Sequence, residues 1–295
     1  MKAATLLLAV TVIMLLPACA SGSSTFGRPV MDDNGQWLAF LTGEEVSVPW
    51  FMKHVRLREQ VSFHWAPVDD LEQVRRIEVA DRGIGESCTG LLGACHFRYA
   101  PDGRHVAIVT PQGIRIVDLA GGAARWLLAD SSETVGSLQW MGDGELVYAS
   151  YRWPEDANGH AVRTFWRQRI DAEERQVVHR DDQVRFGVWP RLLPYNFGNK
   201  PNEFWSSDGR SVLFRGSGRD GEAHLLQIET GELQRIGNGV PLRQASWNRR
   251  RSQVFWYGWE RGGDRRPRAF SLNVVDGEIK DLSESFERVF GQSEV

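Results

Sequence analysis

One short phrase recurs along the chain, and it constrains the fold more than any other feature. It reads YAPDGRHVAIV at residues 99–109 and WSSDGRSVLF at residues 205–214. Weaker copies read DNGQWLAF at 33–40, WMGDGELVY at 140–148 and WNRRRSQVFW at 247–256. Most copies contain a tight turn of the Asp-Gly kind, and every copy leads into an apolar run. Because a repeated unit of this size buries its apolar faces only against its neighbours, the phrase predicts a modular fold.

The fullest unit predicts four short strands. Its apolar runs lie at 94–99, 106–109, 114–119 and 125–128, with turns between them that contain Gly, Pro or Asp. Four strands joined in this way form an up-and-down antiparallel sheet, and the second run is apolar on both faces. This pattern is typical of the blade of a β-propeller, in which sheets stand around a central channel.

The same four-strand cycle fits the rest of the chain. Second strands are expected to begin near residues 36, 104, 145, 210 and 252, and helical periodicity is nearly absent. We therefore predict an all-β chain, a β-propeller of five recognisable four-stranded blades. A sixth blade is possible only if the two ends, 25–31 and 284–295, combine. The turn residues Asp102, Asp143 and Asp208 are interpreted as structural, because Asp caps local amides and the following Gly supplies a positive φ.

The two best copies of the phrase resemble the repeat of TolB-like propellers, a WD-repeat-like group. The same blades form the propeller of prolyl oligopeptidase-type proteases. The resemblance extends over nearly all of the chain after its N-terminal segment, but it is specific only at 99–109 and 205–214. It implies a β-propeller of the bacterial cell envelope.

The N-terminus has the pattern of a targeting segment. A positively charged start precedes an apolar run over 3–16 that is too short for a comfortable membrane span, and LPAC follows at 16–19. These four residues resemble a bacterial lipobox, which implies lipidation of Cys19, although Pro17 departs from the usual residue type. We predict a lipoprotein signal peptide over 1–18, a flexible tether over 19–25 and one propeller domain over 26–295. A plain secretory peptide is the alternative.

The residues after the lipobox bear on localisation and redox state. Ala20, rather than Asp, implies by resemblance to sorted lipoproteins an anchor in the inner leaflet of the outer membrane, facing the periplasm. In that oxidising compartment the two remaining cysteines, Cys88 and Cys95, are predicted to form a disulfide. No metal site is predicted, because these cysteines and His96 lack a second ligand pair. A formal net charge of −3 gives no indication of nucleic-acid binding.

Strand order predicts which end of the propeller is functional. Turns between first and second strands, and between third and fourth, lie at one end and are all tight. The other turns and the crossovers between blades lie at the opposite end, which we call the long-loop face. It is expected to hold the long segments 42–59, 81–95, 152–162, 180–202 and 260–268. Function tends to sit on loops held by a rigid scaffold, so this face is the candidate.

The long-loop face is rich in tryptophan and arginine, the residue types that dominate binding hot spots. The predicted binding residues are Trp50, Trp153, Trp189, Trp259, Arg261, Arg265, Arg266 and Arg268. The alternatives are that the tryptophans fold down over the blade ends and that the arginines are simply solvated.

Catalytic motifs are absent from the sequence. It has no Gly-x-Ser-x-Gly elbow, no His-Glu-x-x-His and no phosphate-binding loop. We therefore predict no enzyme and no cofactor, but a binding or scaffold role with an envelope protein as partner and a polysaccharide as second choice. The enzymatic alternative is a glycosidase-like or sialidase-like propeller, which needs carboxylates about 5–10 Å apart. Its candidate set is Asp181, Asp182 and Glu203.

Overall fold

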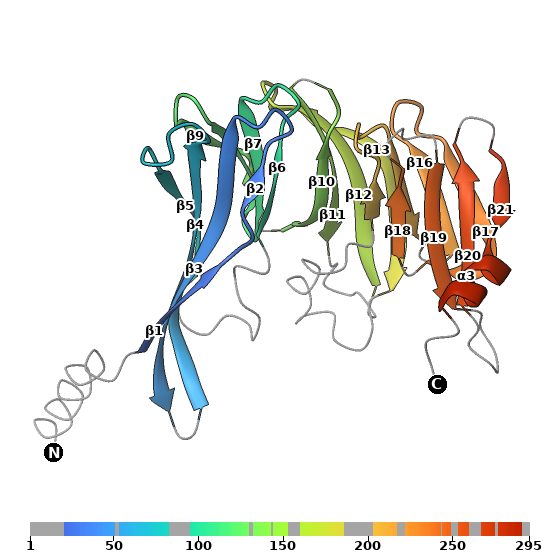
Figure 1. Ribbon diagram of the computed structural model, residues 1–295, viewed down its shortest axis with the longest axis horizontal. Coiled ribbons are helices and arrows are strands. Elements are labelled where there is room, and N and C mark those ends of the chain that lie inside the picture. The colour runs from blue at the N-terminus through green and yellow to red at the C-terminus, as the bar shows by residue number, and fades with distance from the viewer. Residues whose placement is uncertain are drawn as a thin grey trace, which may run out of the picture.

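The computed structural model describes residues 21–50, 53–82, 95–129, 132–142, 144–152, 160–185, 203–216, 222–242, 244–248, 253–259, 267–274 and 277–290. These residues form almost exclusively strands, arranged in five separate antiparallel sheets. The prediction of an all-β propeller with five four-stranded blades is therefore confirmed. We number the sheets blade 1 to blade 5 in chain order (Figure 1).

The blades have these strands. Blade 1 has four strand positions, of which the first is shared by β1 (Ser21–Phe26) and β2 (Val30–Met31), and the others are held by β3 (Trp37–Trp50), β4 (Lys53–Pro67) and β5 (Arg75–Arg82). Blade 2 contains β6 (His96–Tyr99), β7 (His105–Thr110), β8 (Gly113–Asp118) and β9 (Ala124–Ala129). Blade 3 contains β10 (Thr134–Trp140), β11 (Glu145–Arg152), β12 (His160–Arg169) and β13 (Gln176–Arg185). Blade 4 contains β14 (Glu203–Trp205), β15 (Ser211–Arg215), β16 (Glu222–Gln227) and β17 (Leu233–Pro241). Blade 5 contains β18 (Gln244–Trp247), β19 (Gln253–Trp259), β20 (Pro267–Asn273) and β21 (Ile279–Asp281).

In every blade the second strand begins within one residue of the expected position, and in blades 2, 3 and 4 it follows the Asp-Gly pair of the repeated phrase. Gly103 and Gly209 have φ values of 65° and 71°, which residues with a Cβ rarely adopt. Asp102 accepts hydrogen bonds from the backbone amides of Arg104 and His105 at 2.7 and 3.0 Å. Asp208 accepts one from Arg210 at 3.2 Å. Both aspartates therefore cap their turns; Asp143 lies outside the described residues.

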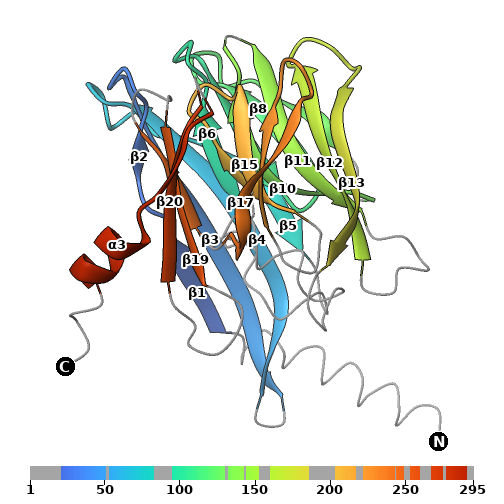
Figure 2. The same ribbon diagram turned by 90° about the vertical axis from the view of Figure 1, so that its right-hand side faces the viewer.

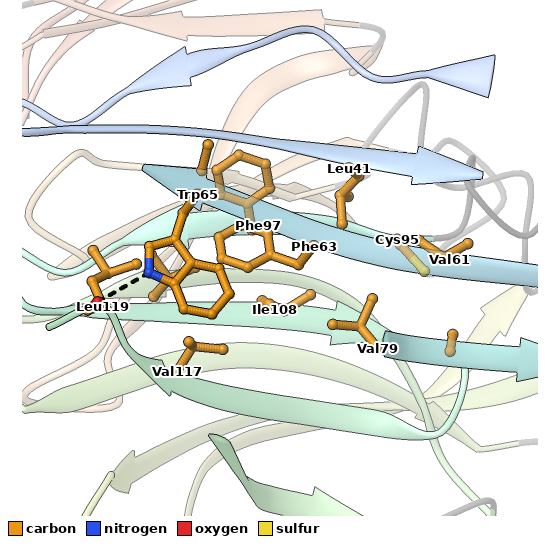
Figure 3. Close-up of a cluster of buried hydrophobic side chains, with 13 residues drawn as sticks. Leu41, Val61, Phe63, Trp65, Val79, Cys95, Phe97, Ile108, Val117 and Leu119 are labelled. Carbon is orange, nitrogen blue, oxygen red and sulfur yellow. Dashed lines mark hydrogen bonds between the residues drawn. The ribbon is translucent and has the colours of Figure 1, made fainter. Parts of the chain in front are cut away.

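Apolar side chains fill the space between neighbouring blades. Alternation along β4 points Val61, Phe63 and Trp65 at blade 2, where they pack on Phe97 and Ile108 (Figure 3). The indole of Trp65 also donates a hydrogen bond to the carbonyl of Leu119 at 3.0 Å. Three further clusters of this kind join blades 2 and 3, 3 and 4, and 4 and 5.

An aromatic residue at the end of an innermost strand joins its blade to the preceding one. The indole of Trp140 donates to the carbonyl of Arg98 at 3.0 Å, and that of Trp247 to the carbonyl of Phe204 at 2.9 Å. The Tyr99 hydroxyl donates to the carbonyl of Val30 at 3.1 Å. We call these contacts aromatic latches. They explain the aromatic residue that opens most copies of the repeated phrase.

Blade 4 uses a variant of the latch. The indole of Trp205 donates to the hydroxyl of Ser137 at 2.9 Å, instead of a carbonyl. In the opposite direction, the Gln139 amide donates to the carbonyl of Ser207 at 3.1 Å. Hydrogen bonds therefore run in both directions between β10 of blade 3 and the first strand and turn of blade 4.

The five blades form an open arc. In Figure 1, blade 1 lies at the left end and blade 5 at the right end of the long axis, with blade 3 between them. In Figure 2, β2 of blade 1 and β20 of blade 5 lie at the left, and β12 and β13 of blade 3 lie at the right. Among the described residues, no apolar cluster joins blade 5 to blade 1. The short helix α3 (Ser283–Phe290) packs against β20 at the end of the arc.

Three expectations differ from the structure. Residues 42–50 and 53–59, expected in a long loop, continue β3 and β4 as one extended hairpin. Residues 21–25, expected in a tether, belong to β1, which pairs with the edge that β3 offers beyond β2. The two ends do not combine into a sixth blade in the described part of the chain, because β1 and β2 join blade 1 and residues 283–290 are helical.

Candidate functional site

A buried arginine lies between blades 3 and 4, close to their long-loop ends. Alternation along β12 points Ala161, Arg163 and Phe165 at blade 4, so a charged residue interrupts an otherwise apolar row. The Arg163 side chain is only 1% exposed. A buried guanidinium is costly unless it is paired and hydrogen-bonded, so its partners define the site.

Arg163 has partners on both blades. Its Nη2 donates to Oδ2 of Asp181 at 2.9 Å, across the β12–β13 pairing, and to the carbonyl oxygen of Arg215 at 2.8 Å. Its Nη1 lies 3.5 Å from Oε1 of Glu203, the first residue of β14. One side chain thus connects the outermost strand of blade 3 to the two innermost strands of blade 4.

Glu203 is as buried as Arg163, with 2% of its side chain exposed. Its Oε1 accepts a hydrogen bond from the hydroxyl of Tyr151, and its Oε2 accepts one from the hydroxyl of Ser137 at 3.1 Å. Both carboxylate oxygens are therefore engaged by donors. Burial, together with the neighbouring Glu203 carboxylate, raises the pKa of Tyr151 well above its ordinary value, so Tyr151 stays a donor.

Aromatic rings and histidines surround the guanidinium on its other sides. The Arg163 Cζ atom lies 4.3 Å from the ring centre of Phe214, within the range of a cation–π contact. The rings of His179 and His224 lie 6.3 and 5.6 Å from the same ring. Burial lowers the pKa of both histidines, and the positive charge of Arg163 lowers both pKa values further. We call the whole group, Tyr151, Arg163, His179, Asp181, Glu203, Phe214 and His224, the Arg163 cluster.

The Arg163 cluster lies beside the segments that the sequence marks as long. Tyr151 precedes residues 153–159, Glu203 follows residues 186–202, and Arg215 precedes residues 217–221. The cluster therefore lies at the strand ends next to two of the long segments predicted from the sequence and next to the shorter segment 217–221. It offers no exposed nucleophile, and its chemistry is that of a rigid charged support.

A second charged group lies on the opposite face of blade 3. Glu133 accepts hydrogen bonds from Arg175 and from the Ser150 hydroxyl, both at 2.9 Å. The Arg175 guanidinium lies 3.8 Å from the ring centre of Trp166. Blade 3 thus carries hydrogen-bonded charged groups on both of its faces.

The structure brings together two of the three residues proposed as a catalytic set. Asp181 and Glu203 share Arg163, but Asp182 points to the other face of β13 and pairs with Arg180 at 2.6 Å. Asp181 and Asp182 lie in β13, the outermost strand of blade 3, and not in a crossover as expected. The physical reason is that β13 pairs with β12 as far as Arg185.

Among the predicted binding residues, Arg268 has a side chain that the structure describes. Arg268 is half-buried, pairs with Asp281 and lies 5.8 Å from the ring centre of Phe270, so it is not simply solvated. Trp50 and Trp259 end β3 and β19, and their side chains lie outside the described part. The following also lie outside the described residues: Trp153, Trp189, Arg261, Arg265, Arg266, Cys19 and Cys88. Cys95 is buried in the cluster between blades 1 and 2, and its disulfide with Cys88 stays a prediction.

Sequence reasoning missed Arg163 and Tyr151. The signal for Arg163 was present, because Ala161 and Phe165 form an apolar row that one arginine interrupts. Such an arginine must meet carboxylates, and Glu203 comes from the next blade. In the described part of the chain, no helix is long and apolar enough to cross a membrane, and no group of three or more His, Cys, Asp or Glu is placed to hold a metal ion.

Comparison with known proteins shows the fold. No protein-family model and no curated protein matches the chain. Among solved structures, Pyrococcus horikoshii acylaminoacyl peptidase matches 90% of this chain and 40% of its own, with 15% identity and a TM-score of 0.52. A puromycin hydrolase matches 88% of this chain and 37% of its own, with 14% identity and a TM-score of 0.52. TolB from Acinetobacter baumannii matches 90% of this chain and 69% of its own, with 9% identity and a TM-score of 0.45.

These likenesses correct one prediction. The chain spans about two fifths of the length of the first matched structures, and those structures are peptidases. The prediction that the chain is not an enzyme is overturned, because a peptidase and a puromycin hydrolase share its fold. A lack of catalytic motifs in the sequence was not enough to exclude enzymatic function.

Proposed function

We propose that this chain is a lipid-anchored envelope propeller that binds a protein or peptide partner at the long-loop face of blades 3 and 4. The observation that carries this proposal is the Arg163 cluster. Its hydrogen bonds connect the five strands from β11 through β15 in one fixed arrangement. These strands adjoin, in the sequence, the segments that contain Trp153 and Trp189. Binding surfaces need such a support, because loops on a rigid base lose less entropy when a partner binds.

A peptide-like partner is favoured over a polysaccharide. Two of the strands that the Arg163 cluster connects, β11 and β15, end in the exposed residues Arg152 and Arg215. Arg and Trp together are typical of protein-binding hot spots. The names of the matched proteins, a peptidase and a puromycin hydrolase, make peptides the first ligand class to test.

The test is affinity capture from the native envelope with the full-length chain. We expect a defined partner that the native chain retains and that a Trp153→Ala/Trp189→Ala variant loses. The matched control is Trp126→Ala, which removes a half-buried tryptophan on β9, away from blades 3 and 4. All variants are first shown to unfold at the same temperature as the native chain. Equal capture by all three proteins, or capture by none, would contradict the proposal.

Anchoring is tested separately from binding. Lipidation at Cys19 predicts that the native chain partitions with membranes and that Cys19→Ser releases it into the soluble envelope fraction. Partition of both proteins with the membrane would contradict lipid anchoring, and it would leave the binding experiment to be judged independently.

A glycan hydrolase is the second candidate, because Asp181 and Glu203 do meet at one site. The geometry supports it less well: both Glu203 oxygens accept hydrogen bonds, and its side chain is inaccessible to a substrate. Hydrolysis of an envelope glycan that is lost in folded Asp181→Asn and Glu203→Gln variants would favour this candidate over the binding role.

A further inference from the structure

The aromatic latches follow one rule of register. Tyr99, Trp140, Trp205 and Trp247 each end an innermost strand, and each pairs with the second residue of the next strand. In blades 2, 3 and 5 this aromatic residue donates to the preceding blade. The acceptor there is the carbonyl of the residue that comes one position before that blade's own strand-end residue. These acceptors are Val30, Arg98 and Phe204.

The same rule defines an acceptor on blade 5 that no latch uses. Ser246 precedes Trp247 and pairs with Phe255, just as Arg98 pairs with Ala107 and Phe204 with Leu213. Its carbonyl therefore lies on the inner edge, as the three used acceptors do. Ser246 is exposed, and no aromatic side chain of the described residues donates to it.

The face of blade 5 beside Ser246 is also open. Phe255 lies opposite Ser246 and is 41% exposed, although its neighbours Val254 and Trp256 are buried against blade 4. Helix α3 packs on β20, the next strand outward, and Ser246 of β18 and Phe255 of β19 remain exposed beside it. Figure 2 shows blade 5 at the end of the arc with no further sheet in front of it.

Blade 1 lacks the group that would complete such a contact. Met31 ends β2 and pairs with Leu38, the second residue of β3, so it holds the register position of the latch aromatics. Methionine has no N–H or O–H to donate, and Met31 is 54% exposed. A second copy of this chain could therefore not latch onto Ser246 through its blade 1.

From this juxtaposition we propose that blade 5 is a docking face for a β-sheet of a different polypeptide, whose innermost strand ends in Trp or Tyr. That residue donates to the Ser246 carbonyl, and the sheet covers Phe255, which continues the contact made between successive blades inside this chain. The outer face of blade 5 then gains a packing partner, as the corresponding faces of blades 1 to 4 have within this chain. This surface is independent of the long-loop face.

The experiment gives blade 1 the missing donor. A full-length Met31→Trp variant supplies both halves of the contact, so its copies are expected to associate from blade 1 of one to blade 5 of the next. Sedimentation velocity should show a sedimentation coefficient that rises with concentration. Met31→Leu, which removes the sulfur without adding a donor, is the matched control and should sediment as the native chain does.

A second substitution locates the contact. Met31→Trp/Phe255→Glu is expected to lose the association, because a carboxylate then faces the incoming sheet. Unchanged sedimentation of a folded Met31→Trp variant would overturn the proposal. So would association of the native chain or of Met31→Leu to the same degree, because the partner would then be a second copy and would need no aromatic donor. Association that survives Phe255→Glu would also place the contact elsewhere.

Discussion

The indole nitrogen of Trp247 lies 2.9 Å from the carbonyl oxygen of Phe204 and joins the innermost strands of blades 5 and 4. The contact repeats what Trp140 does with Arg98 two blades earlier. An aromatic residue at this position buries a large ring and also satisfies a backbone carbonyl on the neighbouring sheet. The repeated phrase therefore encodes the joint between blades as well as the turn within a blade.

The latch of Trp140 should contribute measurably to stability. Trp140→Phe keeps an aromatic ring but leaves the Arg98 carbonyl without its donor, which costs about 1–3 kcal/mol when the site is buried. Trp126→Phe is the matched control, because the Trp126 ring is half-buried and makes a cation–π contact with Arg115. Urea unfolding measures the difference. Equal loss in the two variants would show that the hydrogen bond contributes nothing specific.

Substitutions at two glycines distinguish the cost of backbone strain from the cost of close packing between blades. Gly209 and Gly277 have φ values of 71° and 75°, so alanine is strained at either position by about 1–2 kcal/mol. A Cβ at Gly209 would also lie 2.5 Å from the carbonyl oxygen of Trp140, whereas a Cβ at Gly277 would meet nothing within 4 Å. We expect Gly209→Ala to lower the free energy of unfolding clearly more than Gly277→Ala. Similar losses would mean that blades 3 and 4 adjust to the added methyl group.

The repeat made the blade count and the strand starts predictable, because turn chemistry is local. Asp102 and Gly103 occupy the positions that their residue types predict, and the strand after them begins one residue later than expected. The long β3–β4 hairpin was not predictable in the same way. Its distal part contains Glu44 and Arg58, whose polar character suggests a loop, and only the pairing between the two strands makes it a sheet.

The carboxylates of the candidate site could be predicted from the sequence, but the arginine between them could not. Asp181 and Glu203 stood out as carboxylates near expected strand ends, but their shared partner did not. Arg163 pairs with residues 18 and 40 positions away, on two different blades. The contact with Asp181 follows from the β12–β13 pairing, whereas the contact with Glu203 depends on how blades 3 and 4 pack. Sequence periodicity carries no information about packing between particular blades.

Removing Arg163 should destabilise the chain strongly. Arg163→Met removes the guanidinium that Asp181 and Glu203 share while both side chains stay mostly shielded from water, and breaking a buried pair in this way costs about 3–5 kcal/mol. Arg163→Met/Glu203→Gln should recover part of the loss, because one of the two uncompensated charges is then gone. Chemical denaturation of the three proteins tests this coupling. A double variant no more stable than Arg163→Met would show that Glu203 does not depend on Arg163.

The histidines of the Arg163 cluster should make stability depend on pH. Burial lowers the pKa of His179 and His224 below the ordinary 6.5, so the unfolded chain takes up protons first as the pH falls. Their contribution to stability is complete above about pH 6.5 and is lost as the pH falls from there through the folded-state pKa values. We expect the unfolding temperature to fall between pH 7.5 and pH 5, and His179→Gln/His224→Gln to reduce that fall.

His96 in blade 2, whose pKa burial lowers to about 4, retains part of the dependence in the double variant. The carboxylates with shifted pKa values, such as Asp102, have them below 3.8 and titrate outside this range. A double variant with the native pH profile would show that His179 and His224 do not govern acid stability.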